Sequence, residues 1–139
     1  MNYKIAAKYI KDVKFNIPNA KTFFLLSKNI HNYKINVDIK SIQLKKNILE
    51  IETTLMLNQI KHDSDKIDTK ITHATIIELE GEISDKKKLE EIILIKVPSE
   101  IYSEVRQSFI FLFEKSGFKD IKIDENVDFR KLYKKRKIQ

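Results

Sequence analysis

The sequence is poor in residues that build several common kinds of site, since it has no cysteine, two glycines and two prolines in 139 residues. Without cysteine the chain has no disulfide, thiolate zinc site, iron–sulfur cluster or cysteine nucleophile. Gly81 and Gly117 lie too far apart to form a glycine-rich phosphate loop. The longest apolar runs, residues 92–95 and 109–113, are far shorter than the roughly 18–20 residues of a transmembrane helix. The N-terminus also lacks the apolar segment of a signal peptide, so we expect a cytoplasmic protein.

Length and composition indicate one folded domain over residues 1–139. Apolar residues make up 42% of the chain and charged residues 34%, which is typical of globular proteins. The net charge of +7 is concentrated in a basic tail, residues 130–139, which holds six basic side chains and no acidic one. The almost neutral body is a poor surface for duplex DNA. The tail could bind a phosphate backbone or an acidic peptide, or it could be a solvated helix end.

Four segments alternate between apolar and polar residues, as strands with one buried face do. They span residues 3–17, 33–44, 48–61 and 67–83, and short polar turns separate the last three. This pattern predicts a four-stranded antiparallel sheet of the meander type. Ile10 and Lys11 break the alternation of the first segment, which predicts a β-bulge. An apolar cluster, residues 23–26, lies in the connection to the second strand.

After residue 84 the pattern changes to a helical period, so the predicted fold class is α+β. Pro98 is placed to begin a helix that ends at Gly117, and Asp128 is placed to cap a short final helix over residues 129–137. The second half of the long helix is apolar almost all round. Since a helix packs only one face on its own sheet, the other face predicts contact with a partner. Residues 92–95 fit either a strand or a buried helix.

The sequence offers no constellation of residues for catalysis or metal binding. The three histidines, His31, His62 and His73, do not stand at metal-ligand spacing, and no serine lies in a Gly-x-Ser-x-Gly turn. We expect His31 and His62 to be solvated and His73 to be a core residue with its hydrogen bonds satisfied. The glutamates at positions 78, 80 and 82 fit a solvated sheet face better than a pair of catalytic acids. We therefore expect neither an enzyme nor a bound metal or cofactor.

Three stretches carry a resemblance to a known family. The first is Tyr-Ile-Lys-Asp-Val-Lys-Phe-Asn-Ile-Pro-Asn-Ala at residues 9–20. The second is Pro98, Ile101, Tyr102 and Arg106 at the start of the long helix. The third is Gly117 and Phe118, followed by Val127, Asp128, Phe129, Leu132 and Tyr133. Together with the order of strands and helices, these stretches resemble the SecB family of protein-export chaperones from about residue 5 to residue 133.

The resemblance implies a four-stranded antiparallel sheet with a long helix and a short C-terminal helix packed on one side. It also implies a homotetramer, a dimer of dimers with the long helices between the pairs. That role would use the second apolar face of the long helix. The residues expected at this interface are Val105, Phe109, Ile110, Phe111 and Phe113.

Members of the family hold unfolded polypeptides in apolar surface grooves without ATP, so the resemblance implies that function and unfolded preproteins as partners. By position, Ile35, Val37 and Ile67 fall where the family lines its groove, and Leu132 and Tyr133 are further candidates. Exposed apolar grooves select chains that display apolar residues, with little regard to their sequence. No catalytic residue is needed for this function.

Typical export members dock the motor protein SecA through carboxylates on the sheet surface. At the corresponding positions this chain has Asp12 and Asp68, but it also has Asn16 and Lys70. A charge reversal in a docking patch lowers association rate and affinity. Two alternatives therefore stay open. One is a SecB-like chaperone dedicated to the antitoxin of a toxin–antitoxin system, and the other is a nucleic-acid-binding α+β module that uses the basic tail.

Overall fold

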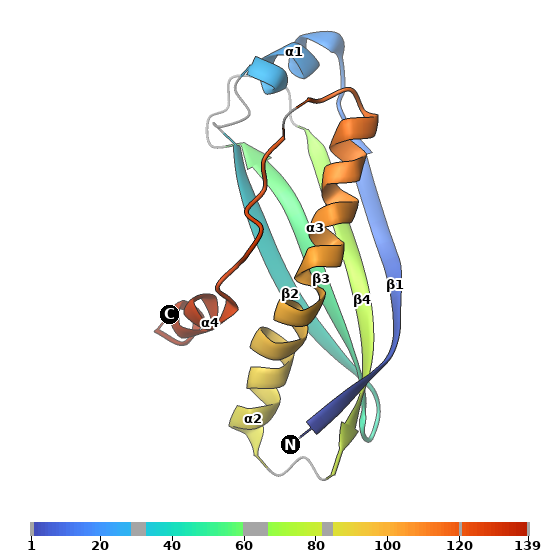
Figure 1. Cartoon of the computed structure of the whole chain (residues 1–139), viewed down its shortest axis with the longest axis vertical. Coiled ribbons are helices and arrows are strands. Elements are labelled where there is room, and N and C mark those ends of the chain that lie inside the picture. The colour runs from blue at the N-terminus through green and yellow to red at the C-terminus, as the bar shows by residue number, and fades with distance from the viewer. Residues whose placement is uncertain (1, 29–32, 60–66, 82–84, 120, 139) are drawn as a thin grey trace.

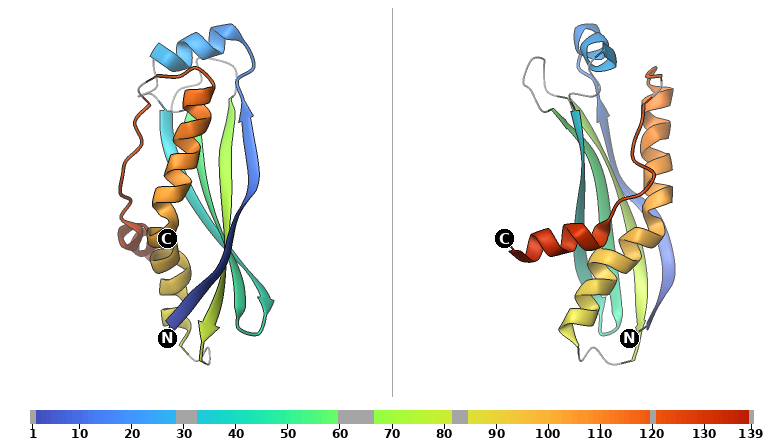
Figure 2. Two further views of the ribbon diagram at one scale, coloured as in Figure 1. Left: turned by 45° about the vertical axis from the view of Figure 1, so that its right-hand side comes forward. Right: turned by 60° about the vertical axis from the view of Figure 1, so that its left-hand side comes forward.

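The computed structural model describes residues 2–28, 33–59, 67–81, 85–119 and 121–138, and for residues 33, 59 and 136–138 the backbone alone. It contains one sheet and a helical rod along one face of that sheet (Figure 1, Figure 2). The strands are β1 (Asn2–Asn16), β2 (Tyr33–Lys45), β3 (Ile48–Gln59) and β4 (Asp68–Glu80). The helices are α1 (Ala20–Lys28), α2 (Lys86–Glu91), the π-helical turn η2 (Ile92–Lys96), α3 (Val97–Lys115) and α4 (Phe129–Ile138).

The sheet has the strand order β1-β4-β3-β2, and every neighbouring pair is antiparallel. β2, β3 and β4 follow one another as the meander, whereas β1 pairs with β4 and lies at the edge opposite β2. Between β1 and β2 the chain crosses from one edge to the other over the end of the sheet where α1 lies (Figure 1). The expected α+β fold with a four-stranded antiparallel sheet is confirmed, and its open edges are β1 and β2.

β1 contains two register shifts along β4, one at residues 5–7 and one at residues 10–12. The second shift confirms the bulge predicted at Ile10 and Lys11. Each extra residue reverses the face that the following side chains take. As a result, Tyr9 lies on the outer face of the sheet, whereas Phe15 lies on the inner face, with its ring centroid 4.9 Å from that of Phe113 on α3.

The helical rod begins at α2, where the sequence pattern turns helical after residue 84. α2 follows Asp85, whose carboxylate accepts hydrogen bonds from two backbone N–H groups of the first turn at 3.0 and 3.3 Å. The ambiguous residues 92–95 belong to η2, in which the N–H of Val97 donates to the carbonyl of Ile92. Pro98 lies in the first turn of α3, as the sequence predicts, but it follows residues that are already helical. It fits directly after the π-helical turn because the wider turn has already interrupted the α-helical hydrogen bonds that proline cannot make.

The structure has a helix, α1, where the sequence indicates only an apolar cluster in a connection. Asn19 caps it, because its side-chain oxygen accepts a hydrogen bond at 2.8 Å from the backbone of the first turn. Leu26 is fully buried, and the ring of Phe23 lies 4.7 Å from that of Phe118. Phe23 also covers Gly117, which has a φ of +100° at the end of α3, so that a Cβ there would lie 3.4 Å from the ring. α1 thus closes one end of the core.

The core lies between the inner face of the sheet and α3. Val105, Phe109 and Phe113 are fully buried in it, at 0% exposure. Their expected role at an interface with another copy is therefore corrected, because the chain's own sheet already covers them. Ile110 is half-buried and Phe111 is 55% exposed, so these two side chains remain at the surface.

Candidate functional site

A groove runs along β2, at a free edge of the sheet. Three adjoining hollows form it: an upper one of about 490 Å³, a central one of about 310 Å³ and a lower one of about 550 Å³. The upper and central hollows share Val37 and Leu132, and the central and lower hollows share Ile39 and Leu94. Because neighbouring hollows share wall residues, we treat them as one surface, called the β2 groove below.

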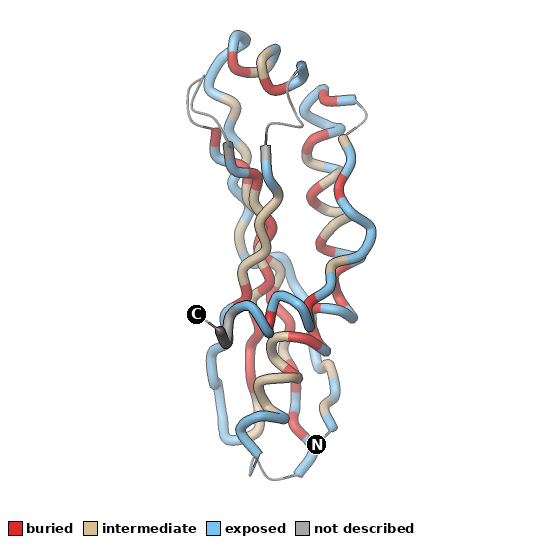
Figure 3. Tube along the Cα trace, turned by 90° about the vertical axis from the view of Figure 1, so that its left-hand side faces the viewer, coloured by how far each residue is buried: buried red, intermediate tan, exposed pale blue. Residues whose placement is uncertain are grey.

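The floor of the β2 groove is the helix-facing side of β2. Ile35 and Val37 are half-buried there, and Ile39 is 9% exposed. Figure 3 shows the molecule from this side, where half-buried residues follow the strand. Alternation along a strand puts these three side chains on one face. Since β2 is an edge strand, half of its backbone N–H and C=O groups face away from the sheet, in a row with which an extended peptide could pair.

The wall opposite β2 in the upper hollow is the extended segment of residues 121–127, which runs beside β2 (Figure 1). Two side chains of α3 fix this segment. The hydroxyl of Tyr102 donates to the carbonyl of Asp124 at 2.7 Å, and the Nε of Arg106 donates to the carbonyl of Ile123 at 2.9 Å. Burial raises the pKa of Tyr102, so its hydroxyl stays protonated and able to donate. The two bonds hold this wall of the upper hollow against α3.

α4 begins beside the helical rod and runs transverse to it, next to the middle of the β2 groove (Figure 2). The ring of Phe129 lies 5.9 Å from that of Tyr102, and the hydroxyl of Tyr133 donates to the carboxylate of Glu90 at 2.8 Å. These contacts anchor one face of α4. Leu132, on the neighbouring face, is 43% exposed and lines both the upper and the central hollows.

The residues expected to contact a client divide into two groups. Ile35, Val37, Leu132 and Tyr133 all line the β2 groove. Ile67 is 6% exposed and belongs to the core at the start of β4, so its placement in a groove is corrected. It precedes the first strand residue that pairs with β1, where the apolar pattern alone does not distinguish a core side chain from a groove side chain.

Sequence reasoning missed the wall that the helical rod supplies. Ile93 and Leu94 of η2 are half-buried and line the lower hollow, and Tyr102 lines the upper one. The signal was the apolar run of residues 92–95. In a helix such a run cannot turn every side chain toward one core, and here Ile92 and Ile95 face the core, leaving the middle pair for the groove.

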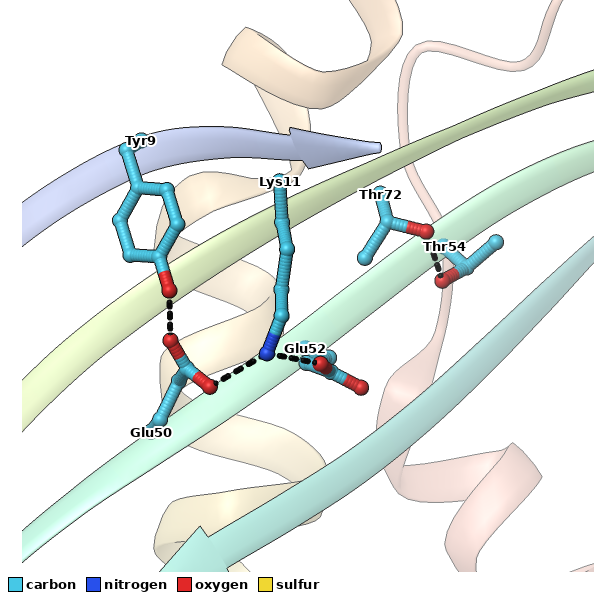
Figure 4. Close-up of polar contacts among 6 residues, drawn as sticks. All are labelled: Tyr9, Lys11, Glu50, Glu52, Thr54 and Thr72. Carbon is cyan, nitrogen blue, oxygen red and sulfur yellow. Dashed lines mark hydrogen bonds and ion pairs between the residues drawn. The ribbon is translucent and has the colours of Figure 1, made fainter. Parts of the chain in front are cut away.

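The outer face of the sheet carries a polar cluster around Glu50 (Figure 4). The hydroxyl of Tyr9 and the Nζ of Lys11 both donate to Glu50, the lysine at 2.8 Å, and Lys11 also pairs with Glu52 at 2.6 Å. Lys11 first and Tyr9 second lower the pKa of Glu50, whose exposure is 5%. In return, hydrogen bonds to Glu50 and Glu52 raise the pKa of Lys11 above its usual range. Within this cluster the positive charge of Lys11 thus partly offsets the negative charges of Glu50 and Glu52.

The two carboxylates expected to dock SecA lie on or near the edge of the sheet formed by β1 and β4. Asp12 pairs with Lys70 at 3.5 Å. Asp68 is exposed at the start of β4, opposite Asn16. The negative charge that Asp12 could present to a basic partner is thus partly offset by a lysine of the same chain.

The part of the chain that the structure describes holds no group of three side chains able to bind a metal ion. The Nε2 atom of His73 is buried, and no described residue makes a hydrogen bond with it. The expectation of a core histidine with satisfied hydrogen bonds is therefore wrong. Burial lowers the pKa of His73. His31 and His62 lie outside the described residues. No helix in the described ranges is long and apolar enough to cross a membrane.

The chain is similar in sequence to known SecB proteins. The family model described as preprotein translocase subunit SecB matches residues 1–139. A protein of Pelagibacter ubique assigned as the export protein SecB is 36% identical over 135 residues, which cover 97% of this chain and 96% of that protein. The protein-export protein SecB of Anaplasma marginale is 27% identical over 142 residues, which cover 94% of this chain and 79% of that protein.

Among solved structures, the fold is similar to that of a Mycobacterium tuberculosis SecB-like chaperone in complex with a peptide from the HigA1 antitoxin. The TM-score is 0.67, and the match covers 90% of this chain and 88% of that chain at 8% sequence identity. This likeness concerns the fold alone. The family match over the whole length and the 36% identity to a relative go further, and they show that the chain belongs to the SecB family of chaperones.

Proposed function

We propose that the chain holds unfolded or non-native polypeptide segments in the β2 groove, without ATP and without catalysis, and keeps them soluble or competent for export. The observation that carries this proposal is the groove itself, which has apolar side chains on its floor and in its walls, with charged residues among them, and lies along a free strand edge. A folded protein hides the side chains that could fill such a groove, whereas an unfolded chain displays them. The groove thus selects conformation rather than sequence.

Two kinds of contact would hold a client. Burying one large apolar side chain contributes about 1.5–3 kcal/mol, and strand pairing with the edge of β2 adds backbone hydrogen bonds that no particular sequence is needed to make. Ordering a flexible segment offsets much of this gain. One groove should therefore bind weakly, and several grooves on one oligomer would hold a long client more tightly through high effective concentration. Binding lowers the concentration of free unfolded client, and by mass action this reduces aggregation.

The proposal includes a cytoplasmic homotetramer, built as a dimer of dimers. Apolar side chains at the surface away from the β2 groove support it: Ile10 and Val13 of β1 are 53% and 45% exposed, and Phe111 of α3 is 55% exposed. Ile110, which precedes Phe111 in the sequence, is half-buried. We expect light scattering to report a tetramer and Phe111→Glu to shift it to a smaller species. A wild-type monomer at all concentrations would contradict this part of the proposal.

The test of client holding measures suppression of aggregation of a denatured model protein, together with the affinity for an extended apolar peptide. Val37→Asp and Leu94→Asp each place a charge in the β2 groove, so we expect each to weaken peptide binding by about tenfold or more, which corresponds to about 1.4 kcal/mol. Phe24→Asp is the matched control, because Phe24 is 63% exposed on α1 and does not line the groove. Unchanged binding by both groove variants would refute the proposal.

A second candidate function within the family is a chaperone that serves one antitoxin. Two observations favour it: the fold is similar to that of the solved complex with an antitoxin peptide, and Asp12 is paired with Lys70 rather than free to dock SecA. Titration calorimetry with purified SecA separates the two roles. Micromolar binding would favour export, and a gain of affinity in Lys70→Glu without binding by the wild type would favour the antitoxin role.

A further inference from the structure

α4 is a strongly basic helix. Arg130, Lys131, Lys134 and Lys135 are all exposed, and the helix contains no acidic residue. Across the described side chains, none of these four cations takes part in an ion pair. They form an uncompensated positive patch, called the α4 cations below.

The α4 cations adjoin the β2 groove at Leu132, which lines the upper and central hollows. Residues three apart on a helix are neighbours on its surface, so Lys135 lies next to Leu132. Two further lysines, Lys34 and Lys122, line the upper hollow itself. The apolar groove therefore has positive charge along α4 and at its upper end.

The carboxylates of the β2 groove offset this charge only in part. Glu52 is engaged in an ion pair of 2.6 Å with a lysine of β1. Glu90 accepts a tyrosine hydroxyl at 2.8 Å, and because that donor is neutral the carboxylate keeps its negative charge. Asp38, Asp124 and Glu90 therefore remain as acidic groups of the groove. Opposed to them are the α4 cations, Lys34, Lys40 and Lys122.

We propose that the β2 groove prefers apolar client segments with acidic residues beside them, and that the α4 cations make this selection. The inference rests on the proposed function, because its ligand is the same extended polypeptide. An aspartate or glutamate of the client, next to the apolar residue anchored in the groove, would lie close enough to the α4 cations to be attracted by them, because the screening length is about 10 Å at 0.1 M salt. A lysine in its place would be repelled. Each exposed ion pair is weak, so we expect a total preference of about five- to twentyfold, expressed largely in the association rate.

The test uses the whole protein and fluorescent peptides that share one apolar core and differ in their flanks: Asp-Glu, Lys-Arg or Ser-Gly. We expect the acid-flanked peptide to bind about tenfold more tightly than the lysine-flanked one at low salt, and the difference to vanish near 0.5 M salt. The double variant Lys131→Glu/Lys135→Glu should reverse the order. Lys14→Glu/Lys21→Glu makes the same change of charge at exposed lysines of β1 and α1, outside the groove, and should behave as the wild type.

The Ser-Gly peptide distinguishes failure of this inference from failure of the proposed function. If it binds and acidic flanks give no advantage, the charge preference is refuted while client holding stands. If no peptide binds, both are refuted.

A single-stranded DNA oligonucleotide serves as competitor. We expect it to displace the acid-flanked peptide only at more than about tenfold higher concentration, because it offers charge without apolar anchors. Displacement at equal concentration would show a general polyanion surface and overturn the proposal.

Discussion

β1 and β2 are the two edge strands of one sheet, and their surroundings differ in shape and in the kind of contact they make. Besides the contact of Phe15 with α3, β1 is joined to the helical rod by polar side chains: the hydroxyl of Tyr3 donates to Glu100 at 2.8 Å, and Lys8 pairs with Glu104 at 2.6 Å. The three hollows of the β2 groove lie at the other edge, where β2 stands apart from the rod and from α4. One edge is closed by polar bonds, and the other is hollow and apolar.

This difference between the β1 edge and the β2 edge indicates that the two edges bind different kinds of ligand, although both are edge strands of the same sheet. A hollow lined by Val37, Leu94 and Leu132 can take in side chains of a flexible peptide. The exposed apolar side chains of β1, Ile10 and Val13, line none of the three hollows described above and fit a preformed surface instead, such as that of a second copy. Shape, rather than the number of exposed apolar residues, separates client from subunit.

Phe113→Ala should have the largest effect, because it removes packing between the rod and the β1 side of the core while leaving the β2 groove untouched. Its ring centroid lies 4.9 Å from that of Phe15 on β1 and 5.1 Å from that of Phe109. Large-to-small substitutions of a buried phenylalanine cost about 3–5 kcal/mol, and we expect a loss of that size in urea denaturation. Phe111→Ala, at a side chain that is 55% exposed in the single chain, is the control and should cost less than about 1 kcal/mol at protein concentrations low enough to dissociate the oligomer. Equal losses would contradict the assignment of the two faces of α3.

Glu50→Gln should have the next largest effect and should depend on pH. Lys11 and Tyr9 lower the pKa of Glu50 in the folded state, so its contribution to stability is complete above the usual carboxyl pKa and disappears as the pH falls through the lowered value. We expect the variant to lose about 1 kcal/mol at pH 7, the size of one charge-assisted hydrogen bond whose lysine partner is partly exposed to solvent. Urea midpoints of both proteins from pH 7 to pH 3 should converge at the acid end. A constant difference would mean that the network does not need the charge.

The strands, the long helix and the bulge at Lys11 could be predicted because each rests on local pattern. The cap at Asp128 is of the same kind, and its carboxylate accepts a hydrogen bond from the N–H of Lys131 at 3.0 Å. The first register shift of β1 could not be predicted, since it falls at Ala6 and Ala7, whose small side chains fit either face. α1 was missed because a nine-residue helix with one cap has a weak periodic signal.

The candidate site shows the same division. Ile35 and Val37 were found through the family's arrangement of strands, but the alternation that marks them is identical for a core strand. Ile67 has that alternation too and is buried. The wall fixed by Tyr102 depends on a hydrogen bond to a residue 22 positions away, which no local pattern encodes. Whether an apolar strand face is covered is decided by tertiary packing alone.

His73→Gln should have a smaller effect, and it tests how tightly β1 covers β4. His73 lies opposite Ile10 of β1, and burial lowers its pKa, so the folded state favours the neutral imidazole. The unfolded chain takes up a proton below the usual histidine pKa, so wild-type stability should fall as the pH drops from 7 to 5.5, by less than about 1 kcal/mol for a half-exposed side chain. The variant should lack this component, while the other two histidines are common to both proteins. Parallel pH profiles would show that solvent reaches His73 through the β1 edge.

Lys8→Met should have the smallest effect, because the Lys8 and Glu104 side chains are 42% and 52% exposed. Surface ion pairs contribute about 0–1 kcal/mol, so a double-mutant cycle with Glu104→Gln should give a coupling energy under about 0.5 kcal/mol in dilute protein. The cycle also reports on the β1 edge in the oligomer. If a second copy covers this edge, the pair loses solvent and the same cycle at high protein concentration should give a larger coupling energy, since desolvated charge pairs interact more strongly. A coupling energy that does not change with concentration would place the contact between copies away from Lys8 and would leave Phe111 as the better marker of the interface.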